Sequence, residues 1–239
     1  MLECLLGGAP AVKDTGPGPQ DLVKSYKAGP GKLTGFYGRV GSEDFITYSQ
    51  LRNMVNVSGA LSTDIGWMKL HIDGKVLFVP RSPICTNITW NQIYNAGAVY
   101  GIPGAGVVFN NLTPKNQNLT IVVQGYKFLV RCFVGANSNP VGIDNGGARD
   151  SSLTKGCEYD RLILNMGVSI QSANQEGPIF GYEFSNPSTA VHVANYSYSA
   201  FNGTQYTLSR NEGWASAYNP TWASTSVGWL PVLELLGKA

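Results

Sequence analysis

Two acidic residues in the middle of the chain have the types and spacing that acid–base chemistry requires. Glu158 and Asp160 stand two positions apart within residues 156–162. Glycoside hydrolases work with such a carboxylate pair, one residue acting as the acid and the other as the base or nucleophile. The adjacent Arg161 indicates the other role, an ion-paired structural corner. We favour the corner, assign no catalytic residue, and keep glycan hydrolysis as an alternative function.

The histidines and cysteines show no catalytic or metal-binding spacing. His71 and His192 are far apart in the sequence, and a general base needs a hydrogen-bonded partner that the sequence does not identify. The cysteines are widely spread and form no C-x-x-C motif; they are Cys4, Cys85, Cys132 and Cys157. Such spacing is typical of reduced, mostly buried thiols, although it leaves the thiol state open. We therefore predict no metal site and no cofactor.

An aromatic cluster near the C-terminal end is the best candidate binding surface. It consists of Trp214, Tyr218 and Trp222, with Asn and Ser residues between them. Exposed aromatic rings among amide and hydroxyl groups are typical of faces that bind sugars or proteins. The same rings could instead pack a long loop, and the sequence leaves both possibilities open.

The composition argues against nucleic-acid and membrane partners. The 239 residues carry a net charge of +2, only 13% of them are charged, and no two Lys or Arg residues are adjacent. Phosphate neutralisation needs clustered cations, and no apolar run approaches the roughly 20 residues that span a bilayer. With 29 glycines and many uncharged polar residues, the surface is expected to make weak contacts with proteins or sugars.

A hairpin over residues 66–80 organises the predicted fold. Apolar and aromatic residues flank Asp73-Gly74, a dipeptide that favours a two-residue turn because glycine adopts positive φ without steric cost. Pro80 ends the second strand because it has no backbone donor. Thr89 then predicts the N-cap of a short helix over residues 90–95.

Further short elements are predicted around this hairpin. They are a strand at 33–40, an amphipathic helix at 49–56 with Leu51, Met54 and Val55 on its apolar face, a second hairpin at 119–134 around Gln124-Gly125, a helical turn running into a strand at 156–164, and a closing strand at 228–235. Residues 165–226 are mostly short polar pieces with scattered aromatics, which predicts a long ordered loop region.

The N-terminal residues are expected to lie outside the folded domain. Residues 1–34 contain repeated Gly-Pro pairs, which sustain neither a helix nor a central strand, with a short helix possible at 21–26. We expect an extended arm that is either disordered or docked on a neighbouring subunit. The globular domain is assigned to residues 35–239.

Four segments carry a resemblance to a known group of proteins. Residues 35–40, 66–80, 156–162 and 228–234, in this order, resemble virion proteins of tailed bacteriophages. Their pattern is similar to a compact C-type-lectin-like domain, the fold shared with formylglycine-generating proteins. The resemblance implies an α+β, β-hairpin-rich fold with short helices and long ordered loops, preceded by the N-terminal arm.

The same resemblance implies a structural role in a phage particle. We expect a component of the tail, the collar or the capsid surface, including capsid decoration, made in the bacterial cytoplasm and then incorporated into the virion. Its partners would be other virion proteins and further copies of itself. The alternative is a host-attachment module that binds a surface glycan or protein through the aromatic cluster, and the second alternative is the glycan hydrolase.

Overall fold

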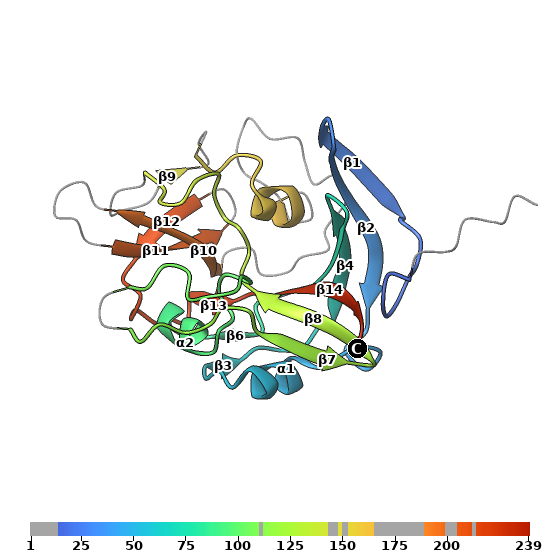
Figure 1. The fold of residues 1–239 in the computed structure, drawn as a ribbon, viewed down its shortest axis with the longest axis horizontal. Coiled ribbons are helices and arrows are strands. Elements are labelled where there is room, and N and C mark those ends of the chain that lie inside the picture. Colours follow the sequence, from blue (N-terminus) through green and yellow to red (C-terminus); the bar gives the residue numbers. More distant parts are fainter. Residues whose placement is uncertain are drawn as a thin grey trace, which may run out of the picture.

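The structure is a computed structural model that describes residues 14–109, 112–142, 148–149, 153–164, 189–198, 205–211 and 214–239. This part of the chain is mostly β-sheet, arranged as two seven-stranded sheets with a few short helices (Figure 1). A sheet-rich α+β class is therefore confirmed.

The first sheet contains the N-terminal, central and C-terminal strands. Its order is β1 (Lys24–Gly29), β2 (Lys32–Val40), β4 (Trp67–Ile72), β5 (Lys75–Pro80), β14 (Val232–Lys238), β8 (Tyr126–Arg131) and β7 (Thr120–Val123). The second sheet has the order β3 (Ala60–Leu61), β6 (Cys85–Thr86), β13 (Val227–Trp229), β10 (Ala190–Tyr198), β11 (Gln205–Asn211), β12 (Trp214–Tyr218) and β9 (Ala148–Arg149).

The predicted central hairpin is confirmed as β4 and β5. Asp73 and Gly74 form its turn with φ of 48° and 89°, the two positive values that a type I′ turn requires. Trp67 opens β4, is fully buried, and donates from Nε1 to the carbonyl of Ile46 at 2.6 Å. The hairpin is therefore anchored to the segment that precedes it in the chain.

Thr89 caps the second short helix as predicted, and Thr47, which the sequence analysis does not single out, caps the first in the same way. In α1 (Tyr48–Val55) and α2 (Trp90–Asn95), a threonine N-cap and the glutamine three residues later form a capping box. One residue was assigned to the wrong face: Met54 is 49% exposed, whereas Leu51 and Val55 are buried. Tyr48, Leu51 and Val55 follow the helical repeat, and Met54 lies about 100° away from that line.

The second hairpin lies where the sequence predicts it, but the single closing strand predicted over residues 228–235 is wrong. That run is divided between β13 in the second sheet and β14 in the first, because Pro231 has no backbone donor and interrupts the ladder. Gln124 and Gly125 connect β7 to β8 with φ of 50° and 76°. The C-terminal strand β14 then inserts between β5 and β8, with Leu233 opposite both Phe78 and Val130. Insertion of β14 joins the two hairpins into one sheet (Figure 1).

The first sheet is buried on both faces at its centre. Trp67 and Phe78 belong to one hydrophobic cluster, which also contains residues of α1 and α2. The alternate residues Met68, Leu70 and Leu77 pack in a second cluster with residues of β10 and β11. This double burial explains why β4 and β5 are almost continuously apolar in sequence.

Three further predictions of local structure are wrong. Residues 24–29 form strand β1 instead of ending a helix. The segment ending at residue 164 is the π-helical turn η1 (Asp160–Leu164) and contains no strand. Much of the region expected to be a long loop is β10, β11 and β12, in which buried polar residues interrupt the apolar alternation that would have revealed strands.

Residues 14–34, which the sequence analysis assigned to the arm, lie against the first sheet. The proposed boundary at residue 34 falls inside β2, and β1 pairs with β2 along its length. The preceding segment, Asp14–Gln20, is called the strap below. The buried Lys69 donates from Nζ to the strap carbonyls of Gly16, at 3.1 Å, and of Pro19, at 2.6 Å.

Lys69 generates a prediction about pH. Burial lowers the pKa of its ammonium to about 8, an effect that the charge of Asp14 partly opposes. Between about pH 8 and pH 10 the unfolded chain, with a lysine pKa near 10.4, holds a proton that the folded chain has lost, so stability due to Lys69 rises with pH. Urea unfolding should therefore show the wild type gaining free energy of unfolding relative to Lys69→Met over this range. Parallel pH profiles for the two proteins would contradict this assignment.

Candidate functional site

Tyr218 and Trp222 form an aromatic pair on the surface. Their rings are stacked, with centroids 4.5 Å apart and an interplanar angle of 15°. The Trp222 side chain is 38% exposed, and Tyr218 is half-buried. A partly exposed, stacked indole presents a flat apolar face with a polar edge, which suits a sugar ring or a protein side chain.

A tight turn brings the two rings together. Asn219 Oδ1 accepts from the backbone nitrogen and the hydroxyl of Thr221, and the Trp222 nitrogen donates to the Asn219 carbonyl at 2.9 Å. The turn is fixed to α2 because Asn91 donates its backbone nitrogen to the Pro220 carbonyl at 3.2 Å. The pair is therefore held on a structured turn beside a helix.

For Trp214, the third member of the predicted cluster, the structure describes the backbone alone. The backbone of Trp214 begins β12, opposite Asn211 and Arg149, whereas its side chain lies outside the described part of the structure. The structure thus brings together Tyr218 and Trp222 of the three predicted residues.

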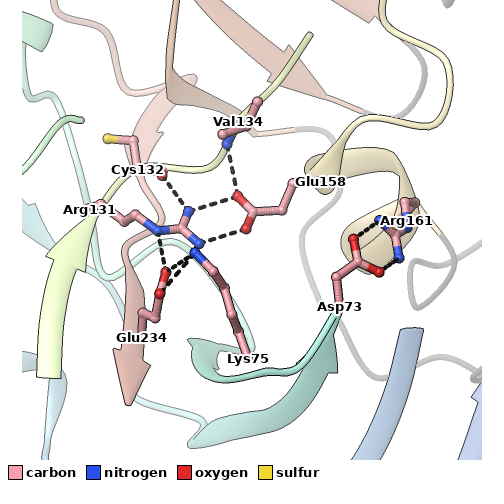
Figure 2. A network of polar contacts seen from close by, with 8 residues as sticks. All are labelled: Asp73, Lys75, Arg131, Cys132, Val134, Glu158, Arg161 and Glu234. Carbon is pink, nitrogen blue, oxygen red and sulfur yellow. Dashed lines mark hydrogen bonds and ion pairs between the residues drawn. The ribbon is translucent and has the colours of Figure 1, made fainter. Parts of the chain in front are cut away.

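Glu158 is held in a buried ion-pair network (Figure 2). Its two carboxylate oxygens accept from Nη1 and Nη2 of Arg131, at 2.7 and 2.6 Å. One of these oxygens also accepts from the Val134 nitrogen at 2.9 Å. Arg131 Nε reaches Glu234 at 3.2 Å, and Lys75 binds the same Glu234 carboxylate at 2.9 Å. The network therefore links β5, β8 and β14 to the segment that contains Glu158.

The charge of Arg131 is matched by its surroundings. Burial disfavours the charged guanidinium, but Glu158 and Glu234 more than offset this effect, so the pKa of Arg131 is raised above its ordinary value. A bidentate pair with a carboxylate is the strongest arrangement that a guanidinium can form. Glu158 is thus a structural anion at this position.

The neighbouring charges of the corner are paired separately. Asp160 contacts Arg210, and Arg161 forms a bidentate pair with Asp73 at 2.6 and 2.7 Å. The hydrogen bonds from Arg161 are the main reason why the pKa of Asp73 is lowered. The predicted ion-paired corner is present, although Glu158 and Asp160 are bound by distant arginines and not by the adjacent Arg161.

The described thiols and His192 are buried. Cys85, Cys132 and Cys157 are free, and burial raises the pKa of each to about 12. Burial also lowers the pKa of His192 to about 4, and its Nε2 lies 3.0 Å from the Ile88 carbonyl. Cys4 lies outside the described residues.

The sequence analysis did not single out two buried cations, Arg131 and Lys69. Each has apolar residues or a cysteine on both sides in the sequence, Val130 and Cys132 for Arg131, and Met68 and Leu70 for Lys69. A charged residue inside an apolar strand signals a buried partner, because an unpaired charge there is too costly. The sequence shows both cations next to apolar residues, but it does not show that Arg131 binds Glu158 and Glu234 or that Lys69 binds the strap.

Comparisons with family models, curated proteins and solved structures found no match to this chain. Within the described residues, no group of three or more His, Cys, Asp or Glu side chains could hold a metal ion. No helix in that same part of the chain is long and apolar enough to cross a membrane.

The network predicts a graded effect of breaking its contacts. Glu158→Gln leaves the buried Arg131 without its bidentate partner and should cost about 3–5 kcal/mol of unfolding free energy. Lys75→Met is the matched control, because this lysine is 55% exposed at the edge of the same network, and it should cost less than about 1 kcal/mol. Urea denaturation measures both variants. Equal effects would show that Glu158 is not the central anion.

Proposed function

We propose that this chain is a structural subunit of a phage particle, on the tail, the collar or the capsid surface, and that it acts through contacts between subunits. The observation that carries the proposal is the outer edge of β1, the outermost strand of the first sheet, with three exposed apolar side chains on this strand and just before it (Figure 1). Val23 is 67% exposed, and Leu22 and Tyr26 are more than one-third exposed. Such an edge presents unpaired backbone groups to another chain, and Lys24 and Lys27 on β1 restrict the pairing to a partner that accommodates their charge.

We propose a common lineage with phage virion proteins that carry a C-type-lectin-like domain, on the four segments that resemble them in sequence. Strand β2 pairs with β4, and β5 pairs with β14. The ion pair of Arg161 with Asp73 then ties residues 156–162 to the central hairpin. The four segments therefore form one connected unit, as expected if they were retained together.

We propose no catalytic role for Glu158 and Asp160. Each carboxylate is bound by a buried arginine, which supports a structural role for both. The proposal also places the protein in the virion, where its partners are other virion proteins and copies of itself.

Host attachment is a second candidate function, favoured by the stacked pair of Tyr218 and Trp222. In this case the pair would bind a glycan or a protein of the host surface. Attachment and a structural role are compatible, because many weakly binding copies on one particle gain effective concentration.

The structural role is tested by counting copies in purified particles. Quantitative mass spectrometry of gradient-purified virions from the source phage should find this chain in a fixed ratio to the major capsid protein. That ratio should match a symmetric component of the particle, because closed assemblies repeat their subunits by symmetry. Presence of the chain in the lysate but not in washed particles would contradict the proposal.

The attachment function is tested by removing the exposed indole. Trp222→Ala should abolish binding of the purified chain to host cells or to their surface glycans, since ring stacking supplies most of the contact. Leu236→Ala is the matched control, because Leu236 is another exposed apolar side chain and lies on strand β14, whereas Trp222 lies in the turn after β12. Equal binding by wild type and Trp222→Ala would rule out this surface.

A further inference from the structure

The strap Asp14–Gln20 occupies a site that is built into the first sheet. Lys69 lies within the face of that sheet, with Nζ 5.2 Å from the centroid of the Tyr37 ring and 5.6 Å from that of Phe78. Both of its recorded hydrogen-bond acceptors are strap carbonyls, those of Gly16 and Pro19. A buried ammonium needs such acceptors, so the site selects a segment with two converging carbonyl groups.

The shape of the site selects glycine and proline. A Cβ atom added at Gly16 would lie 3.1 Å from Leu235, and one added at Gly18 would lie 2.7 Å from Val40. Both glycines have positive φ, at 82° and 77°. Pro19 in turn packs over Gly38, where an added Cβ would lie 3.2 Å away. The Gly-Pro-Gly-Pro sequence of the strap therefore matches the site in both conformation and volume.

The strap is a preformed unit that ends in an ion pair. The Gln20 side chain closes it, accepting from the Thr15 nitrogen and hydroxyl and donating to the carbonyls of Gly16 and Gly18. At the other end, Asp14 lies 3.3 Å from Lys238 Nζ on β14. These contacts give the strap its own shape, while its docking depends on groups of the sheet.

A short connection joins the strap to the rest of the chain. The first ladder hydrogen bond after the strap runs from the Val23 nitrogen to the Phe36 carbonyl, at 2.8 Å. Residues 21 and 22 between them are exposed. A change of backbone direction at these two residues would carry the whole strap away from its own sheet while leaving β1 paired.

We propose that neighbouring copies exchange this strap, so that Asp14–Gln20 of one copy docks over Lys69 of another. This exchange rests on the proposed function, because it specifies which segment makes the contact between neighbouring subunits. Exchange of an identical element reproduces the same contacts between copies and so costs little. High local concentration in a particle favours docking in the neighbour. We assign the site to the strap of a second copy because the site already fits this segment, and every copy carries the same segment.

The ion pair between Asp14 and Lys238 allows a test on the unaltered full chain. Chains labelled with ¹⁴N and ¹⁵N are refolded together at high concentration, and a carbodiimide then couples the contacting carboxylate and amine. Exchange predicts coupled peptides in which Asp14 is light and Lys238 is heavy, in the proportion expected for random pairing. Asp14→Asn is the control that removes the coupling. Same-isotope peptides alone would overturn the proposal.

A disulfide test covers the case in which coupling is inefficient. A Cβ added at Gly18 lies 3.6 Å from Val40 Cβ, within the distance range of a disulfide. In a Cys4→Ser background, Gly18→Cys and Val40→Cys chains refolded together should form covalent heterodimers on a non-reducing gel. The same two substitutions on one chain are the positive control, and its closure without heterodimers in the mixture would overturn exchange. Failure of the proposed function would appear separately, as absence of the chain from particles.

Discussion

The ion pairs of the buried Arg131 guanidinium with Glu158 and Glu234 are the interactions on which the rest of this structure depends. Arg131 stands at the end of β8 and binds Glu234 of β14 and Glu158 of the segment before η1. The strand β14 unites the two predicted hairpins, and Glu158 belongs to the segment that carries the other two ion pairs of the corner. An arginine without these carboxylates would be an uncompensated buried charge, so all three elements must be in place together.

Lys69 shows the contrasting case on the opposite face of the same sheet. The register puts Lys69 opposite Phe78, and Phe78 opposite Leu233, whereas Arg131 and Glu234 belong to the alternate positions. Arg131 is neutralised by two carboxylates and its pKa is raised, but Lys69 has carbonyl acceptors and its pKa is lowered. Arg131 thus joins three elements through ion pairs, whereas Lys69 holds the strap through hydrogen bonds to neutral carbonyl groups.

Much of the fold could be predicted because local chemistry determines it. Asp73-Gly74 and Gln124-Gly125 specify their turns through backbone conformation, and the two Thr-x-x-Gln caps specify where the helices begin. The strands β10 and β11 escaped prediction because tertiary contacts override the pattern. Thr207, Ser209 and Arg210 are buried there, and the two Nη atoms of Arg210 donate to Gly135 and Asp160, which are remote in sequence.

The candidate site also contains one part that the sequence could predict and one part that it could not. Tyr218 and Trp222 could be paired from sequence because a four-residue separation across Asn219-Pro220 indicates a turn. The partner of Glu158 could not, since Arg131 is 27 positions away. Likewise, the glycines of the N-terminal segment predicted an extended chain, but only the structure reveals the buried lysine that binds it.

Together these features describe a weakly charged domain, and we propose that its exposed sheet edge and strap contact neighbouring subunits of a phage particle. A cryo-electron microscopy map of the intact particle tests this claim most directly. We predict density for many symmetry-related copies of the domain, each contacting its neighbours through the first sheet. A well-resolved map in which every protein density is assigned to other chains would contradict the account.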